Sequence, residues 1–319
     1  MRSTALLTAL FALVFSASST AFAADPQLLN LVMPDAKLIA GLNVTSARIS
    51  PLGQFLLTKM PTENLPAGMT VDSVTEIVAA SAATPGGHSG LLLAKGTFDA
   101  EKIVAAIEAT KNPPAHQVKT YAGAELITFT APDGKTAAAV AFIGSTVVVA
   151  GDAPTVMAAL DRSSANNAID PALAAQVNSL SGTQDAWIVS AVSPASLMPA
   201  PKAPAAGQSA SPIDIGQFLA TIQAFSGGVK FGATVPVKLD VVSNSDKNAE
   251  ALATVVKFAV SMLSMNAGQA KQDPNTAAAM KLLQTLQVTN TGANVDIALT
   301  VPEAQIEALI GSLSKPKAN

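Results

Sequence analysis

The chain has few residues of the types that bind metals or act as activated nucleophiles. It contains no cysteine and two histidines, His88 and His116, which fall in different predicted loops. A zinc site needs several such donors at close range, and the chain has no His-Glu-x-x-His segment. We therefore expect no metal site, and we interpret both histidines as ordinary loop residues.

Two serine motifs resemble those of hydrolases, but neither has the required context. Gly207–Ser211 comes nearest to Gly-x-Ser-x-Gly, which requires a strand-to-helix turn and a later histidine. Here the motif follows both histidines and lies in a stretch rich in Pro, Ala and Ser. Ser312–Lys315 fits Ser-x-x-Lys but lies near the C-terminus, and no Lys-Thr-Gly follows. We expect no catalytic residue in either motif.

Carboxylate pairs for glycoside hydrolysis are assembled in three dimensions and have no sequence signature. Sugar sites usually add aromatic platforms, and here Trp187 and Tyr121 are the candidates besides the phenylalanines. Trp187 falls in a predicted strand, where we expect it to be partly buried. Met262, Met265 and Met280 are interpreted as core residues of helices. No Gly-rich phosphate loop is present, so no cofactor is expected.

The composition is that of a chain with a large apolar core. Of its 319 residues, 49% are hydrophobic and 13% charged, about half of the roughly 25% charged residues usual in soluble domains. The net charge is −3 and no cluster of Lys and Arg is visible, which argues against nucleic acid as a partner. Without cysteine the protein can carry neither a disulfide nor an N-terminal lipid on cysteine.

Residues 1–23 have the parts of a secretory signal peptide. Arg2 gives a positive start, Ala5 to Phe15 an apolar segment, and Ala21-Phe22-Ala23 a small-x-small cleavage site. Serines interrupt the apolar run before it reaches the ~20 residues of a membrane span. We expect cleavage to leave Ala24 as the new N-terminus. The mature chain would then carry 18 basic and 22 acidic residues, have no transmembrane span, and be periplasmic or secreted.

One sequence pattern occurs twice. Asp35 to Leu42 is an Asp-Ala start followed by an apolar run, and Asp185 to Val192 repeats it 150 residues later. Pro51-Leu52-Gly53-Gln54-Phe55-Leu56 is echoed by Ile215-Gly216-Gln217-Phe218-Leu219, where the two glutamines are 163 residues apart. The difference of 13 residues falls on a Pro/Ala/Ser-rich insertion at 193–212.

Two further landmarks keep the same order. The helix that begins near Asp99 is matched near Asp246 after 147 residues, and the helix at Pro154 is matched at Pro302 after 148. These offsets predict an internal repeat, with residues 24–165 as the first α+β unit and 166–319 as the second.

Hairpin and helix signals give each unit the order strand, helix, two strands, helix, strands, helix. The expected strands are 36–44, 74–83, 90–96, 117–121, 124–131, 136–143, 146–150, 186–192, 228–234, 237–243, 286–289 and 294–301. A further helix is expected at 276–285. Consecutive hairpins predict an α+β fold of two similar lobes, each a mainly antiparallel sheet with helices on one face. The two sheets either pack side by side or join into one.

The repeated Asp-Ala strand and Pro-Leu-Gly-Gln-Phe-Leu helix, followed by a hairpin unit, resemble a group of secreted bacterial proteins of unknown function. The resemblance covers most of residues 34–314. It implies an extracytoplasmic two-lobed fold and brings no catalytic residues.

We therefore expect an exported binding or envelope-associated protein rather than an enzyme. Its ligand or partner, an apolar small molecule or another envelope protein, would be held between the lobes. One alternative is a metal-free periplasmic hydrolase that uses scattered Asp, Ser and Lys residues. A cluster of Asp and Lys with shifted pKa values in one cleft would favour it. Another is an assembly or chaperone-like factor that offers an edge strand or the 193–212 loop to a client. The sequence leaves the oligomeric state open.

Overall fold

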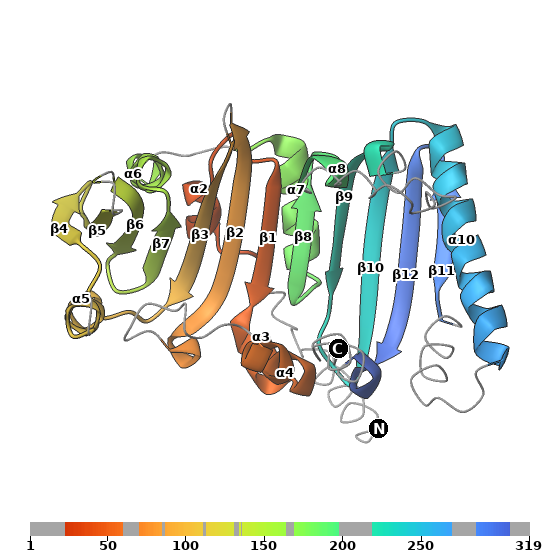
Figure 1. Cartoon of the computed structure of the whole chain (residues 1–319), viewed down its shortest axis with the longest axis horizontal. Coiled ribbons are helices and arrows are strands. Elements are labelled where there is room, and N and C mark those ends of the chain that lie inside the picture. The colour runs from red at the N-terminus through yellow and green to blue at the C-terminus, as the bar shows by residue number, and fades with distance from the viewer. Residues whose placement is uncertain are drawn as a thin grey trace, which may run out of the picture.

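A single antiparallel sheet forms the centre of the molecule (Figure 1). The computed structural model describes residues 23–59, 70–84, 87–110, 113–130, 134, 136–163, 169–197, 219–269 and 285–306. Twelve strands follow one another in the order β11-β12-β10-β9-β8-β1-β2-β3-β7-β6-β5-β4. They are β1 Leu38–Asn43, β2 Val74–Thr84, β3 Gly87–Gly96, β4 His116–Tyr121, β5 Ala124–Thr130, β6 Thr136–Ile143, β7 Val147–Gly151, β8 Ala186–Ser190, β9 Ile222–Val229, β10 Thr234–Ser243, β11 Gln287–Thr291 and β12 Asn294–Pro302.

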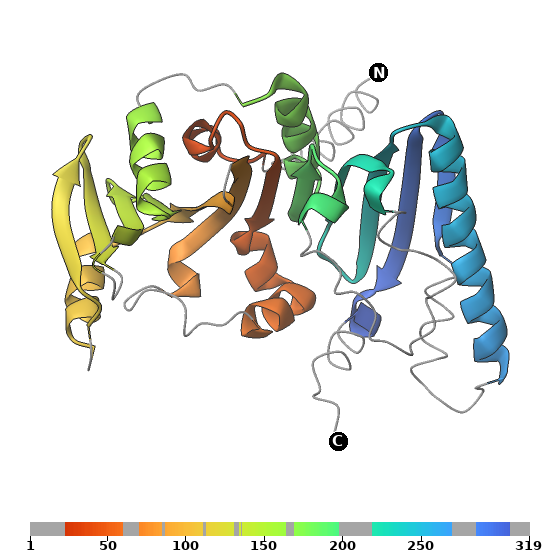
Figure 2. The same ribbon diagram turned by 45° about the horizontal axis from the view of Figure 1, so that its top comes forward.

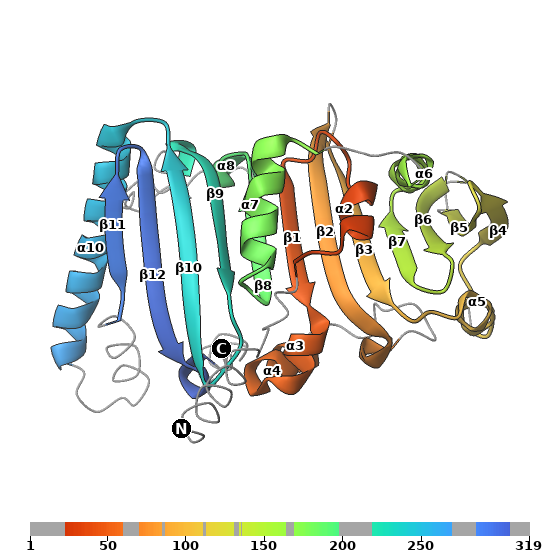
Figure 3. The same cartoon turned by 180° about the vertical axis from the view of Figure 1, so that it is seen from behind.

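Helices lie on both faces of this sheet, with α2, α6 and α7 on one face and α3, α5 and α10 on the other (Figures 2 and 3). A short 3-10 turn, Val71–Ser73, leads into β2. The helices are α2 Pro26–Leu31, α3 Val44–Ile49, α4 Pro51–Lys59, α5 Ala100–Glu108, α6 Ala153–Arg162, α7 Pro171–Ser181, α8 Pro194–Leu197 and α10 Asp246–Gln269.

The predicted α+β class with a mainly antiparallel sheet is confirmed. Of the two arrangements left open, the joined sheet is the one observed. The helices differ from the expectation, since they cover both faces instead of one. The reason lies in strands such as β7, where Val147, Val148 and Val149 are all buried. Successive side chains of a strand point to opposite faces, so such a run requires cover on both.

The pair β1·β8 lies at the centre of the strand order. Outward from it, β1-β2-β3-β7 on one side is matched by β8-β9-β10-β12 on the other. Ile39 of β1 is paired with Val189 of β8, and these residues are separated by the same 150 positions as Asp35 and Asp185. The arrangement agrees with the proposed repeat, whose limits at 24–165 and 166–319 stay a prediction.

A second contact connects the two ends of the sequence. The carboxylate of Glu303, just after β12, accepts hydrogen bonds from the Ser50 hydroxyl at 3.1 Å and from the backbone N–H of Leu52. Ser50 also caps α4, because its Oγ accepts the N–H of Gly53 at 3.1 Å. Ser50-Pro51 is a helix-start signal in the sequence, because serine can cap free amides and proline fits the first helical turn. The structure confirms this start, and Glu303 ties it to the second half of the sheet.

Most predicted caps and hairpins are confirmed, with corrections in the second half. Asp99 caps α5 by accepting the N–H of Lys102 at 3.1 Å. In α10 the cap is Ser245, whose Oγ accepts the N–H of Asn248 at 3.2 Å, and Asp246 is the first helical residue. β9 was predicted at 228–234 but spans Ile222–Val229, because small residues in this strand obscure the alternation of apolar and polar positions.

The 193–212 insertion starts with helix α8 rather than with a loop, since Pro194 fits a first helical turn. The rest of this insertion, the repeated segment before Leu219 and residues 276–284 of the predicted helix at 276–285 lie outside the described residues, and Thr285 is in a turn.

Helix α10 carries apolar side chains on two faces. Leu252 and Ala253 are buried against the sheet, whereas Phe258 and Met262 are 57% and 48% exposed. The prediction that Met262 is a core residue was therefore wrong, because its apolar stripe faces away from the sheet; the side chains of Met265 and Met280 lie outside the described residues. In the described part of the chain, no helix is both long enough and apolar enough for a bilayer crossing.

Candidate functional site

A groove lies between α7 and the second half of the sheet. Its volume is about 340 Å³, at the lower end of the ~300–1,000 Å³ typical of small-molecule sites. We call it the α7 groove. It is lined by α7, β9, β10, β11 and β12 through Gln176, Ser179, Leu180, Ala224, Phe225, Ser226, Asp240, Val241, Val242, Thr291, Asn294 and Asp296.

The floor of the α7 groove carries a polar row that crosses three strands. Asp240 of β10 is paired with Ser226 of β9 on one side and with Asp296 of β12 on the other. Directly paired residues of antiparallel strands point to the same face of the sheet. Helix α7 packs on β8 and β9, so it forms one wall of the groove, and no helix of the described part of the chain lies over β10 and β12 on this face (Figure 3).

The two carboxyl groups of this row interact directly. Burial raises the pKa of Asp240, a hydrogen bond with Asp296 and its negative charge raise it further, and Lys238 acts in the opposite direction. Asp240 is exposed, so its raised pKa changes the free energy of unfolding only slightly. The nearby Asp296 therefore favours the neutral form of Asp240.

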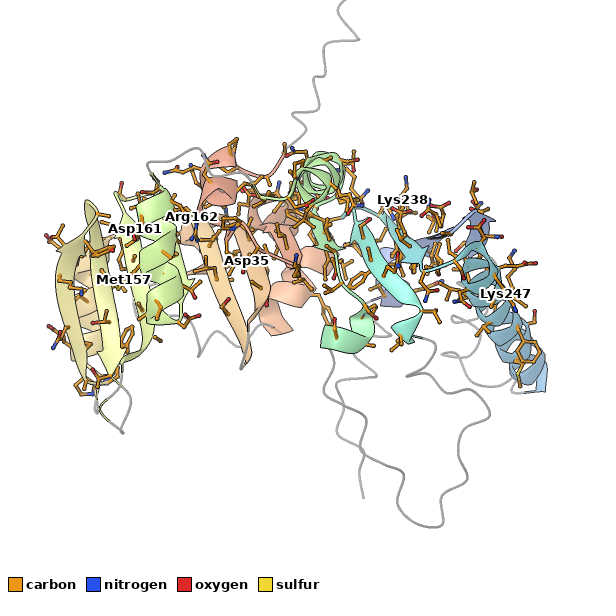
Figure 4. The ribbon with its side chains drawn as sticks, turned by 90° about the horizontal axis from the view of Figure 1, so that it is seen from above. Asp35, Met157, Asp161, Arg162, Lys238 and Lys247 are labelled. Atoms are coloured by element: carbon orange, nitrogen blue, oxygen red, sulfur yellow. The ribbon has the colours of Figure 1, made fainter. Side chains whose placement is uncertain are left out.

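This geometry limits the chemistry of the pair. Hydrogen-bonded carboxyl groups are closer than the ~5–5.5 Å of retaining glycosidases or the ~6.5–9.5 Å of inverting ones. They are suited instead to accept hydrogen bonds from a ligand or to attract a cation. Figure 4 places Lys238 on the same side of the sheet as α7.

The two histidines do not contribute to this site. His88 pairs with Ala83 in the β2–β3 hairpin, and His116 is the first residue of the edge strand β4. His116 Nδ1 lies 2.9 Å from the carbonyl oxygen of Pro114, and its Nε2 lies 3.7 Å from the Glu108 carboxylate. Both residues therefore belong to strand ends rather than to loops. Within the described residues, no three His, Asp or Glu side chains gather as a metal site would require.

The two aromatic candidates have structural surroundings. Trp187 is 6% exposed on β8, where its ring covers Gly41 of β1, so it is buried more completely than the partial burial expected of it. Tyr121 donates a hydrogen bond from its hydroxyl to Asp161 on α6 at 3.2 Å, and this bond raises the pKa of Tyr121. The serine motifs at 207–211 and 312–315 lie outside the described residues.

A charged contact holds α6 to the chain before β1. The Arg162 guanidinium donates to the carbonyl oxygen of Leu31 at 3.0 Å. Burial lowers the pKa of Arg162, while the negative charges of Asp35 and Asp161 act in the opposite direction. Figure 4 places Asp161 and Arg162 on α6 and Asp35 toward the middle of the molecule, and none of the three lines the α7 groove. The Asp35 that opens the first sequence pattern therefore acts on Arg162 through its charge.

The predicted cleavage site ends where the described chain begins. Ala21 lies outside the described residues, Ala23 is exposed, and Ala24 is 3% exposed within the largest apolar core. Cleavage itself stays a prediction.

Comparison with known proteins shows a fold and no family. No family model matches the chain, and no curated protein matches it. The chain is similar to crystal form IV of TP0453, a bacterial protein of unknown function, with a TM-score of 0.54 and 12% identity over 92% of this chain and 99% of that one. For crystal form III the TM-score is 0.53 and the identity 11%, over 89% and 97% of the two chains. At this identity the likeness shows the fold alone.

Proposed function

We propose that this chain is an exported binding protein and that its ligand site is the α7 groove. The observation that carries the proposal is the row Ser226–Asp240–Asp296 on the floor of a hollow of about 340 Å³. Binding sites characteristically combine a concave surface with a few convergent polar groups. The signal-like residues 1–23 support export.

The lining favours a polar ligand over an apolar one. The carboxyl oxygens of Asp240 and Asp296 are acceptors, and Ser226, Asn294 and Gln176 add further polar groups. An apolar molecule would leave these groups without partners, which is costly. We therefore propose a small polar ligand that carries an amine or several hydrogen-bond donors.

The position of the groove also changes the proposed mode of binding. The two halves of the sheet join through the ladder between β1 and β8, and the α7 groove lies beside this junction, over the second half. The ligand would accordingly be held by the second predicted unit and not between the two units.

Three probes of different chemistry test this proposal on the mature chain, residues 24–319. Spermidine, trehalose and dodecanoic acid represent a polycation, a neutral polar molecule and an apolar acid. We expect spermidine to bind best in isothermal titration calorimetry. Ser179→Trp places an indole in the groove and is expected to weaken that binding at least tenfold, or about 1.4 kcal/mol.

Asn178→Trp is the matched control, because Asn178 is exposed on the same helix but does not line the groove. It should bind as the wild type does. Equal spermidine binding by both tryptophan variants would exclude the groove as the site, and preferential binding of dodecanoic acid would exclude the proposed ligand class.

One observation favours the hydrolase alternative. Asp240, whose pKa is raised, lies in one groove with Asp296 and close to Lys238, which is the pattern that would favour an acid–base site. Turnover of p-nitrophenyl acetate that disappears in Asp240→Asn and in Asp296→Asn would support catalysis. Turnover that survives both substitutions would remove this alternative.

A further inference from the structure

The start of the described chain is anchored in the fold. The methyl group of Ala24 is buried in the core beneath α2, and the backbone N–H of Asp25 donates to both carboxylate oxygens of Glu76, at 3.2 and 3.3 Å. The Asp25 side chain caps α2 through the N–H of Gln27 at 2.8 Å. It also forms an ion pair with Lys95 at 3.0 Å. Residue Ala23, one position earlier, is exposed.

Glu76 is the unusual group in this arrangement. It lies on β2 between Asn43 of β1 and Lys95 of β3. The Lys95 ammonium instead bonds to Asp25 and, at 2.8 Å, to Gln27. Among the described residues, no basic side chain lies within ion-pair distance of Glu76. Burial raises the pKa of Glu76 to about 7, the negative charge of Asp25 acts in the same direction, and the Asp25 N–H and Lys95 oppose it.

We infer that Glu76 is the counter-ion of the α-ammonium group that cleavage after Ala23 would create on Ala24. The inference rests on the export part of the proposed function. An endopeptidase and one water molecule would hydrolyse the Ala23–Ala24 peptide bond. The new carboxylate would leave on Ala23, and the new amine on Ala24 would take up a proton.

The geometry brings this ammonium to the carboxylate. The nitrogen of Ala24 precedes by one residue the Asp25 nitrogen that already contacts Glu76. The buried Ala24 side chain fixes the chain at that point, and the exposed Ala23 marks where a cleaved segment would depart. An α-amino group has an ordinary pKa of about 7.7–8.0, so it is mostly charged at pH 7 and offers three donors. The polar and charged groups around Glu76 are Asp25 and Gln27 at the start of α2, Asn43 of β1 and Lys95 of β3.

The test compares two chains at pH 7. One begins at Ala24, released by a protease that cuts directly before it, and the other carries a Gly-Ser extension ahead of Ala24. In the chain that begins at Ala24, Glu76→Gln is expected to lower the melting temperature by about 2–4 °C, because it removes an ion pair. In the extended chain the same substitution is expected to raise it, because glutamine still accepts the Asp25 N–H and leaves no buried charge.

The stability of the extended chain should also depend more strongly on pH than that of the chain that begins at Ala24. Its Glu76 has a folded pKa of about 7, above the ordinary value of a glutamate, so the native state binds more protons than the unfolded state between about pH 4.5 and 7. The stabilisation from Glu76 is therefore complete below pH 4.5 and is lost as the pH rises through 7. In the chain that begins at Ala24, this loss should be smaller.

The reversal of sign is the decisive result. An effect of Glu76→Gln in the same direction in both chains would overturn the inference, as would an N-terminus other than Ala24 in the exported protein by N-terminal sequencing. Neither result bears on spermidine binding in the α7 groove, so the two proposals fail separately.

Discussion

Trp187→Ala is expected to lower the free energy of unfolding by about 3–5 kcal/mol, which is the usual cost of removing a buried indole. Trp187 is 6% exposed and belongs to the core that packs under α2, α6 and α7. Its ring lies over Gly41 at the pair β1·β8, where the two halves of the sheet meet. The substitution therefore opens a cavity at the junction that both halves share.

Urea unfolding followed by far-UV circular dichroism measures this loss, since Trp187 is the single tryptophan of the chain and its fluorescence disappears with it. Trp187→Phe is the matched control and should cost less, because it retains an aromatic ring. A loss below about 1 kcal/mol for Trp187→Ala would contradict the packing described here.

The neighbouring glycine offers an independent check of the same contact. A methyl group at Gly41 would lie within the van der Waals radius of the indole ring, so Gly41→Ala should cost about 1–3 kcal/mol in the wild type. In the Trp187→Ala background that cost should largely vanish. The coupling in this double-mutant cycle reports the contact directly.

Gly53→Ala is expected to destabilise the protein by about 1–3 kcal/mol. Alanine is intrinsically better than glycine in a helix by about 1 kcal/mol, so helix propensity alone predicts the opposite sign. Packing decides the outcome, because a methyl group at Gly53 of α4 would lie less than 3.0 Å from the backbone of Ala47 in α3. No change of rotamer can relieve a clash with backbone atoms.

Gly90→Ala is the control for this prediction. Gly90 is exposed on β3, and the nearest atom to an added methyl group is the Ala80 carbonyl oxygen at 3.8 Å. When the two variants are compared with the wild type by thermal unfolding, Gly90→Ala should be neutral or slightly stabilising, whereas Gly53→Ala should melt at a lower temperature. If Gly53→Ala proved as harmless as Gly90→Ala, α3 and α4 would not pack as closely as described.

Much of the fold follows from local sequence signals. Asp-Gly and Gly-Ser pairs favour tight hairpins; Gly134 and Gly144 stand in such pairs between β5, β6 and β7, and they have φ values of 79° and 58°. Ser50-Pro51 and Asp99 predicted helix starts that the hydrogen bonds confirm. Turns and caps depend on residues close in the chain, which is why short-range reasoning succeeds there.

The candidate site could not be predicted in the same way. Asp240 follows Leu239 and precedes Val241, and Asp296 stands between Val295 and Ile297, so each aspartate reads as an ordinary outward-facing residue of a strand. Only the register of β10 against β12 makes them neighbours. That register depends on contacts between segments that are far apart in the sequence, and so does the packing of α7 on β8 and β9. The sequence repeat suggested a cleft between two separate lobes. It contains no signal for the pairing of β1 with β8, which joins the two halves into one sheet.

Binding of a small polar ligand in the α7 groove is tested most directly by amide NMR spectra of the chain 24–319 titrated with spermidine. We predict that resonances of Ser226, Asp240 and Asp296 and of α7 shift with one common saturation curve, while those of β4, β5 and β6 stay in place. Shifts confined to the first half of the sheet, or no saturable shift in the groove, would contradict ligand binding in the α7 groove.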